Sequence, residues 1–236
     1  MADDVIAPPY DVINSKEAFE LAKDRPNSFL HISKPEIDLE NSIAYNDPKV
    51  YQKGKNNLDQ MIESGVLIED SEDMLYLYEM IDNDIHQLGI AAVGSVDAYE
   101  KGQIKRHEFT KPDKELDRVN NISSLNAQTG PVLLTYLDNE ELSSLLHSVA
   151  KRETPIYDVN AIDGVIHRIY QVDQYGEQEK ILSILNSMDS LFIADGHHRS
   201  AAAGVVKKTR QMDNPQHTGQ ESYNYFLTVS FPESQM

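Results

Sequence analysis

The chain has 236 residues, and its 39 acidic side chains outnumber the 21 basic ones, which gives a formal net charge of −18 at pH 7. Its composition is 40% hydrophobic and 25% charged, as in globular proteins, and no apolar run approaches the ~18 residues of a membrane span. The lack of cysteine excludes disulfides, thiolate metal ligands and a cysteine nucleophile. The acidic balance disfavours nucleic acid as a partner, although a small anion can bind in a locally positive pocket. Because the N-terminus has no signal-peptide pattern, we expect a cytoplasmic protein without a membrane segment; the oligomeric state is not determined.

The N-terminal segment combines an extended strap with a short helix. Residues 7–12 contain two consecutive prolines, which exclude helix and favour extended backbone. Asn14 and Glu17 then have the spacing of a capping box, so a helix is predicted over 15–24.

A strand, a loop and a longer helix are predicted next. Residues 27–32 have the pattern of a short strand, and 33–46 that of a loop. A second helix is expected to begin at Pro48 and to end at Gly65. Its predicted apolar stripe consists of Val50, Tyr51, Leu58, Met61 and Ile62.

Two β-hairpins are predicted from strand-like runs that flank turn residues. Residues 74–81 and 85–96 surround an Asp-Asn-Asp turn, and residues 156–172 surround an Asp-Gly turn. The other expected elements are a polar loop entering a helix (104–118), a buried strand (129–136), helices over 139–150 and 175–188, a strand–turn–helix unit (190–208) and a final strand (223–231). This order favours a single α+β domain over 1–236, with a mixed sheet and flanking helices. Since a domain rarely ends directly after a strand, we expect a further C-terminal part.

The strand–turn–helix unit carries the most informative motif, Asp-Gly-His-His-Arg at 195–199. Free backbone N–H groups and the positive end of the helix dipole meet at its turn, where Gly196 lets a phosphate approach closely. Arg199 can form paired hydrogen bonds to phosphate oxygens, and His197 and His198 add donors. Asp195 can cap the helix, orient a histidine or bind Mg²⁺. The alternative is a capped helix with two surface histidines.

A second charged group lies at 105–108. Beside a phosphate, Lys105 and Arg106 would neutralise charge. Glu108 is a candidate general base, and His107 a candidate hydrogen-bond donor to the substrate. The alternative is an exposed charged loop, the usual role of a charge run.

Three further candidates are the N-terminal strap, the segment before Gly130 and a metal site. Tyr10 and Asp11 in the N-terminal strap, and Gln128 and Thr129 before a Gly-Pro turn, could contact a substrate or serve only the fold. A His/carboxylate metal site for hydrolysis is a further possibility, with donors from His107, Glu108, Asp195, His197 and His198, but no HExxH spacing is present.

Five motifs together resemble the bacterial and archaeal domain-of-unknown-function 1015 family (DUF1015), across essentially the whole chain. They are APPYDV (7–12), SFLHISKPEIDL (28–39), IKRHEFTKPDKELDR (104–118), AQTGPVLLTY (127–136) and IADGHHR (193–199). The last motif is also similar to that of free-serine kinases with a ParB/sulfiredoxin-like core.

The second resemblance implies a small-molecule kinase that phosphorylates L-serine with ADP or ATP and Mg²⁺. Residues 195–199 would then hold the nucleotide phosphates, and Glu108 would activate the serine hydroxyl. The long separation of Glu108 from Asp195 implies an insertion in that core. A non-enzymatic ParB-like nucleotide-binding regulator is the alternative, with a metal-dependent hydrolase ranked third.

Overall fold

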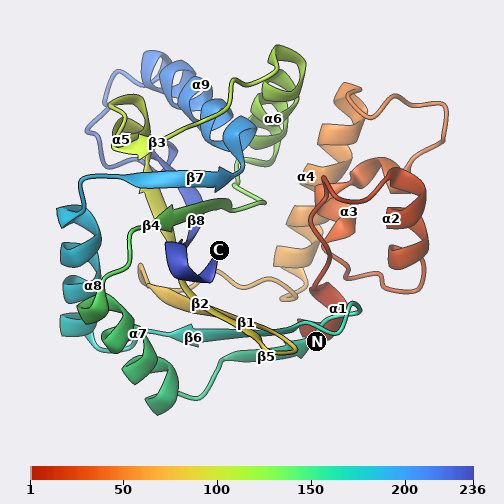
Figure 1. The fold of residues 1–236 in the computed structure, drawn as a ribbon. Coiled ribbons are helices and arrows are strands. Elements are labelled where there is room, and N and C mark those ends of the chain that lie inside the picture. Colours follow the sequence, from red (N-terminus) through yellow and green to blue (C-terminus); the bar gives the residue numbers. More distant parts are fainter. Residues whose placement is uncertain (1) are drawn as a thin grey trace.

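A computed structural model describes residues 2–236 and shows an α+β fold built on one mixed sheet (Figure 1). The strands are β1 Tyr76–Asp82, β2 Ile85–Ser95, β3 Ile104–Lys105, β4 Val132–Tyr136, β5 Tyr157–Asn160, β6 Ile166–Gln171, β7 Leu191–Asp195 and β8 Tyr225–Pro232. Their order across the sheet is β3-β7-β4-β8-β2-β1-β6-β5. The pairs β3–β7 and β4–β8 are parallel, and the other neighbours are antiparallel. The predicted α+β class with a mixed sheet is confirmed.

Both predicted hairpins are present. Strands β1 and β2 pair from Tyr76 with Ala91 to Asp82 with Ile85, and Asn83 turns with a positive φ of 51°. Strands β5 and β6 pair likewise around Gly164, whose φ is 87°. Local turn chemistry therefore determined these two connections.

Two pairs of helices pack against different strands of the sheet. They are α1 Ala2–Val5, α2 Ser15–Ala22, α3 Leu30–Ser33, α4 Pro48–Glu63, α5 Val96–Glu100, α6 Pro112–Leu125, α7 Glu140–Arg152, α8 Tyr175–Ser187 and α9 His197–Asp213, with 3₁₀ turns η1 Pro35–Asp38, η2 Ser222–Asn224 and η3 Glu233–Gln235. Helices α7 and α8 bury Leu146 and Ile181 against β1, β2 and β6. Helices α5 and α9 pack against β4, β7 and β8. Helix α6 packs along α9, and α4 packs on α6, so α2, α3 and α4 lie beyond α6, whereas α1 lies beside β5 (Figure 1).

The two predicted N-terminal helices are confirmed. The Asn14 side chain accepts from the backbone of Lys16 and Glu17, and the Glu17 carboxylate accepts from the Asn14 N–H. Helix α4 is capped by Asp47. Its predicted apolar stripe is wrong at Ile62, which is 52% exposed because it lies on the solvent side.

The predicted strand at 27–32 is wrong, because residues 27–29 form an irregular turn and Leu30–Ser33 form α3. Leu30 packs with Ala18 and Ala22, whereas Ile32 packs with Leu58 and Met61. Residues two apart point in nearly opposite directions on a helix, so the alternating apolar pattern serves a helix buried on two sides. The following segment, expected to be a loop, contains the short turn η1.

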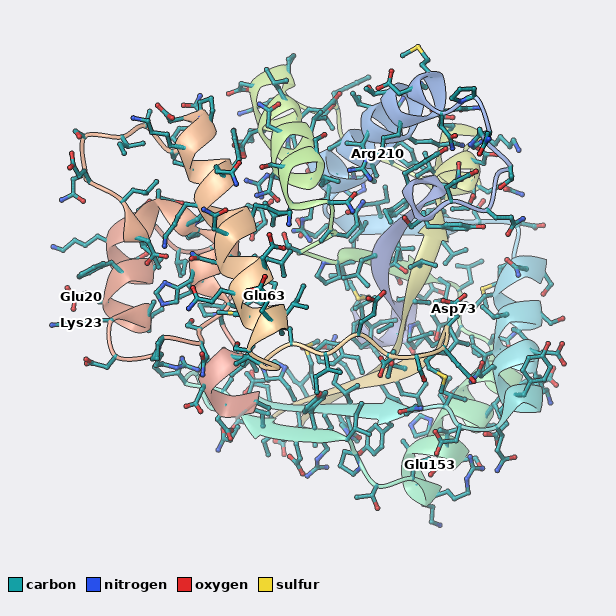
Figure 2. All side chains as sticks on the ribbon, turned by 180° about the vertical axis from the view of Figure 1, so that it is seen from behind. Glu20, Lys23, Glu63, Asp73, Glu153 and Arg210 are labelled. Carbon is teal, nitrogen blue, oxygen red and sulfur yellow. The ribbon has the colours of Figure 1, made fainter. Side chains whose placement is uncertain are left out.

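Acidic side chains are distributed over the surface. Figure 2 shows Glu20 and Glu63 on α2 and α4, and both are exposed.

Within residues 2–236, no helix is both long and apolar enough to cross a membrane.

Candidate functional site

The junction between β7 and α9 has the geometry that the Asp-Gly-His-His-Arg motif predicts. The buried Ile193 fixes β7 in the sheet, and Gly196 turns the chain with a φ of +96° before α9 begins at His197. A Cβ at Gly196 would lie 3.1 Å from Val132 Cα, so both backbone conformation and space require glycine. No described side chain caps α9, which leaves its first-turn N–H groups without a side-chain acceptor.

Arg199 joins three segments that are distant in the sequence. Its guanidinium donates to Asp195 at 2.7 Å, to Asp11 at 3.1 Å and to the carbonyl of Pro131. The Arg199 side chain is only 13% exposed. Arg199 thus fastens the N-terminal strap and the start of β4 onto the first turn of α9, and its hydrogen bonds go to protein oxygens rather than being free for phosphate.

The predicted catalytic loop also lies against this turn. Glu108 Oε2 is 3.9 Å from His197 Nδ1, and the His107 and His197 rings meet edge to face at 4.5 Å. Glu108 is 62% exposed, so it is open to a substrate. Glu108 and His197 are 89 residues apart in the sequence but adjacent in space, and the chain between them forms α6, β4 to β6, α7, α8 and β7.

The two histidines of the motif have different surroundings. His197 is 5% exposed; burial, followed by the charge of His107, lowers its pKa below the ordinary value of 6.5. His197 is therefore neutral at pH 7. The Nε2 atom of His198 accepts the backbone N–H of Lys111 at 3.1 Å, which leaves the ring proton on Nδ1. His197 lies toward Glu108, whereas His198 lines a cavity.

Tyr10 of the strap is part of this cavity. The guanidinium of Arg118 lies 4.3 Å from the Tyr10 ring centre, and that of Arg199 lies 5.9 Å from it. Although burial disfavours its charge, Tyr10 and Asp117 raise the pKa of Arg118, so it stays a cation. Both members of the Tyr10–Asp11 pair consequently contact arginines near the motif, an arrangement that fits both alternatives, a substrate contact and a structural strap.

Other candidates lie less close to the motif. Lys105 lies 5.4 Å from the Phe192 ring centre, and Arg106 donates to the Tyr99 hydroxyl at 3.3 Å. Neither cation contacts residues 195–199. Gln128 and Thr129 make no hydrogen bond to any part of the chain that the structure describes, although the turn that follows them contacts Arg199.

The metal hypotheses receive little support from the donor set. Among the described residues, no three His, Asp or Glu side chains are grouped to hold a metal ion. Asp195 is 64% exposed but engages Arg199 through Oδ2. This arrangement fits the single carboxylate that often accompanies phosphates around Mg²⁺, and it does not fit a hydrolytic site with three protein ligands.

Sequence reasoning missed most of the cavity. Its lining includes Ser33, Tyr45, Lys114 and Asn121, which come from α3, a loop and α6. The sequence signals were the motifs at 28–39 and 104–118, which contain Ser33 and Lys114, whereas Tyr45 and Asn121 lie outside both motifs. The expected local excess of positive charge is not found in this lining: Lys34, Lys114 and Arg118 are balanced by Asp11, Glu36 and Asp117.

The site and fold together define an α+β protein with an uncapped helix N-terminus beside a polar cavity. The model of the family described as "Protein of unknown function (DUF1015)" matches residues 1–236, so the chain belongs to this family. Comparison with curated proteins and with solved structures gave no match.

Proposed function

We propose that the protein is a small-molecule kinase that transfers a phosphoryl group from ADP or ATP to free L-serine, giving O-phosphoserine. One observation carries the proposal: three separate parts of the chain, represented by Asp11, by Glu108 with Lys111, and by Pro131, all contact residues 195–199. Phosphoryl transfer needs this kind of convergence, because catalysis consists mainly of positioning and electrostatic stabilisation. The proposal also makes β7 and α9 part of a ParB/sulfiredoxin-like core.

The phosphates of the donor would bind at the N-terminus of α9. An uncapped helix terminus supplies backbone N–H groups and a favourable dipole, and Gly196 allows close approach. Asp195 would offer one carboxylate oxygen to a Mg²⁺ ion carried by the nucleotide. Arg199 serves as a positioning residue, because its bonds to Asp11 and Asp195 hold the strap and the strand end in place.

Glu108 is the proposed general base. It would take the proton of the serine hydroxyl while that oxygen attacks the terminal phosphorus and the bond to the bridging oxygen breaks, which releases the nucleotide shortened by one phosphate. His197 is neutral at pH 7 because burial lowers its pKa, so its proximity does not tie up Glu108 in a strong ion pair. A reaction that consumes ADP or ATP requires a nucleotide-containing compartment, which places the proposed activity in the cytoplasm.

The test is to incubate the protein with L-serine, Mg²⁺ and either ADP or ATP and to measure O-phosphoserine by mass spectrometry. Glu108→Gln should lower turnover by a factor of roughly 10² to 10⁴, the usual contribution of a general base, and leave nucleotide affinity unchanged. Glu63→Gln, the same change at an exposed site on α4, is the matched control and should retain full turnover.

Two results would reject parts of this proposal. Lack of product with both nucleotides would reject the kinase activity, and nucleotide binding without product would instead support the non-enzymatic regulator. Loss of nucleotide affinity in Glu108→Gln would reject the role of Glu108 as base.

A further inference from the structure

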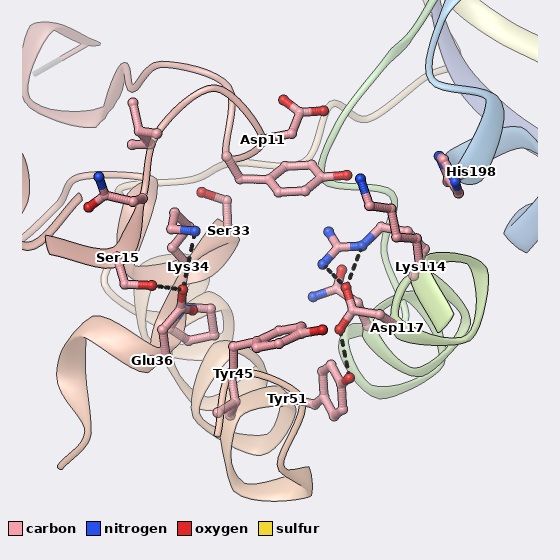
Figure 3. Close-up of a pocket in the computed structure, with 17 residues that line it drawn as sticks. Asp11, Ser15, Ser33, Lys34, Glu36, Tyr45, Tyr51, Lys114, Asp117 and His198 are labelled. Carbon is pink, nitrogen blue, oxygen red and sulfur yellow. Dashed lines mark hydrogen bonds and ion pairs between the residues drawn. The ribbon is translucent and has the colours of Figure 1, made fainter. Parts of the chain in front are cut away.

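A cavity of about 480 Å³ lies between the N-terminal helices and α6 (Figure 3). Tyr45 and Tyr51 border it on one side, and Lys114 and His198 on the other (Figure 3). Since His198 belongs to the first turn of α9, the cavity opens onto the proposed phosphate position. Its volume lies within the 300–1,000 Å³ range of small-molecule sites and is much larger than a three-carbon amino acid needs.

Some polar groups in this cavity have no protein partner. Asn121 is 5% exposed, and its side-chain amide makes no hydrogen bond to any described residue. Ser33 Oγ is buried and likewise unpaired within residues 2–236. Unlike Ser33 Oγ, the Asn121 amide is not fully enclosed by protein, so it faces the cavity and can hydrogen-bond to a polar ligand there.

Most of the charged side chains around the cavity form ion pairs within the protein. Lys34 pairs with Glu36 at 3.2 Å, Arg118 with Asp117 at 2.5 Å, and Asp11 with Arg199 at 3.1 Å. Lys114 is the lining lysine or arginine that makes no ion pair with any described residue. The cavity thus offers one cation without an ion pair, an unpaired amide and tyrosine rings.

We propose that this cavity binds the nucleoside of the phosphate donor, an inference that rests on the proposed function. A flat base can stack on the exposed Tyr45 ring, and the amide of Asn121 can both donate to and accept from its edge. Lys114 neutralises phosphate charge on the path from the cavity to His198. The acceptor then approaches from the opposite side of the α9 turn, where His197 and Glu108 lie.

The experiment measures binding by calorimetry for adenosine, ADP and pyrophosphate, with Tyr45→Ala and Lys114→Ala as test variants. Both residues are exposed and make no hydrogen bond or ion pair to another described residue, so both variants should fold. Tyr45→Ala should weaken adenosine and ADP about ten-fold, the order expected for lost base stacking, and leave pyrophosphate unchanged. Lys114→Ala should weaken ADP and pyrophosphate but not adenosine. Tyr175→Ala, which alters a tyrosine 72% exposed on α8, is the control and should change none of them.

Kinetic constants separate this inference from the kinase proposal. A ten-fold higher KM for nucleotide in Tyr45→Ala, with an unchanged KM for serine, would support the cavity as the nucleoside site. The reverse pattern would overturn it and make the cavity the acceptor site. If ADP binds in a Tyr45-dependent way but no O-phosphoserine forms, the inference holds while the kinase proposal fails. Adenosine affinity that does not respond to Tyr45→Ala would also overturn the inference.

Discussion

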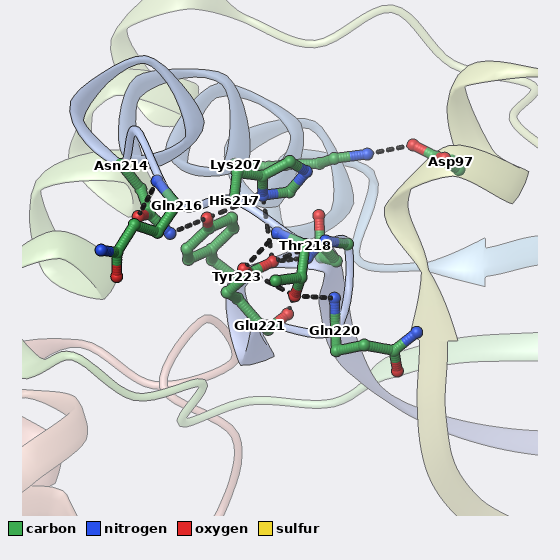
Figure 4. Close-up of polar contacts among 11 residues, drawn as sticks. Asp97, Lys207, Asn214, Gln216, His217, Thr218, Gln220, Glu221 and Tyr223 are labelled. Atoms are coloured by element: carbon green, nitrogen blue, oxygen red, sulfur yellow. Dashed lines mark hydrogen bonds and ion pairs between the residues drawn. The ribbon is translucent and has the colours of Figure 1, made fainter.

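The two ends of α9 differ in how completely the protein satisfies its own polar groups. At the N-terminal end, no described side chain caps the helix, and the Asn121 amide faces the adjoining cavity without a partner among the described residues. At the C-terminal end, residues 214–224 form a loop whose polar side chains pair with one another (Figure 4). Unpaired polar groups are expected at a binding site and paired ones in a structural connection, because a polar group that is already hydrogen-bonded within the protein gains little by binding a ligand.

The C-terminal loop is organised around Glu221. Its carboxylate accepts from the Thr218 N–H at 2.6 Å, the Thr218 hydroxyl at 2.9 Å and the Gly219 N–H at 3.0 Å. The Tyr223 hydroxyl accepts from Asn214 Nδ2 at 3.0 Å and lies 2.9 Å from His217 Nδ1. These contacts resemble those of a well-satisfied turn, so the loop carries no functional proposal.

The largest effect on stability is expected at Arg199. Arg199→Ala leaves Asp11 and Asp195 without their cation and frees the strap, so it should lower the free energy of unfolding by about 2 kcal/mol, less than for a fully buried pair. Arg210→Ala, on the same helix, removes a hydrogen bond to Asn126 and should cost about 1 kcal/mol or less. Urea denaturation of both variants compares them; equal losses would contradict the joining role of Arg199.

Gly196 is expected to be similarly sensitive. Gly196→Ala requires an L side chain at a φ of +96° and brings its Cβ to 3.1 Å from Val132 Cα, so we expect a loss of about 2 kcal/mol. Gly102 has a similar φ of +75° but nothing within 4 Å, so Gly102→Ala should cost about 1 kcal/mol. Similar losses in thermal unfolding would mean that the contact with Val132 is unimportant.

The loop at the other end of α9 should depend on pH through Glu221. Burial opposes its charge, but hydrogen bonds from Thr218 and Gly219 dominate and lower the pKa of Glu221 to about 2 from an ordinary value of 4.5. Because the folded-state pKa is lowered, the stabilisation is present above pH 4.5 and is lost as the pH falls toward 2. Glu221→Gln should therefore lower the Tm at pH 7 by a few degrees, and the difference from wild type should shrink between pH 4.5 and 2. The exposed control Glu20→Gln should leave the Tm unchanged. A Tm difference for Glu221→Gln that stays constant across this pH range would contradict the lowered pKa of Glu221.

The smallest effect on stability is expected for Ser33→Ala. Its comparison with Tyr223→Phe tests whether an unpaired hydroxyl contributes less to stability than a paired one. Ser33→Ala removes a buried hydroxyl that lacks a described partner, so stability should change by less than about 0.5 kcal/mol or rise slightly. Tyr223→Phe removes a hydroxyl bonded to Asn214 and should cost about 1 kcal/mol. Denaturant titration measures both, and a larger loss for Ser33→Ala would remove the contrast between the two ends of α9.

Local sequence signals predicted elements well where the signal and the packing agreed. The capping box at Asn14 and the Asp-Gly turn at 163–164 each contain their own hydrogen-bonding or conformational requirement, and both predicted elements formed. The strand predicted at 27–32 failed because Leu30 and Ile32 are buried by two different helices. Such tertiary packing overrides a short local pattern.

The sequence by itself determined the element that presents the candidate site, because an apolar run, a glycine and an alanine-rich segment suffice to specify strand, turn and helix. It also singled out Glu108 and Asp11 as chemically suitable. Only the tertiary structure decided that both lie against 195–199, since contact between residues so distant in the sequence depends on how the sheet and helices pack. The same packing formed the cavity: Tyr45, Lys114 and Asn121 become neighbours only when the N-terminal helices close against α6.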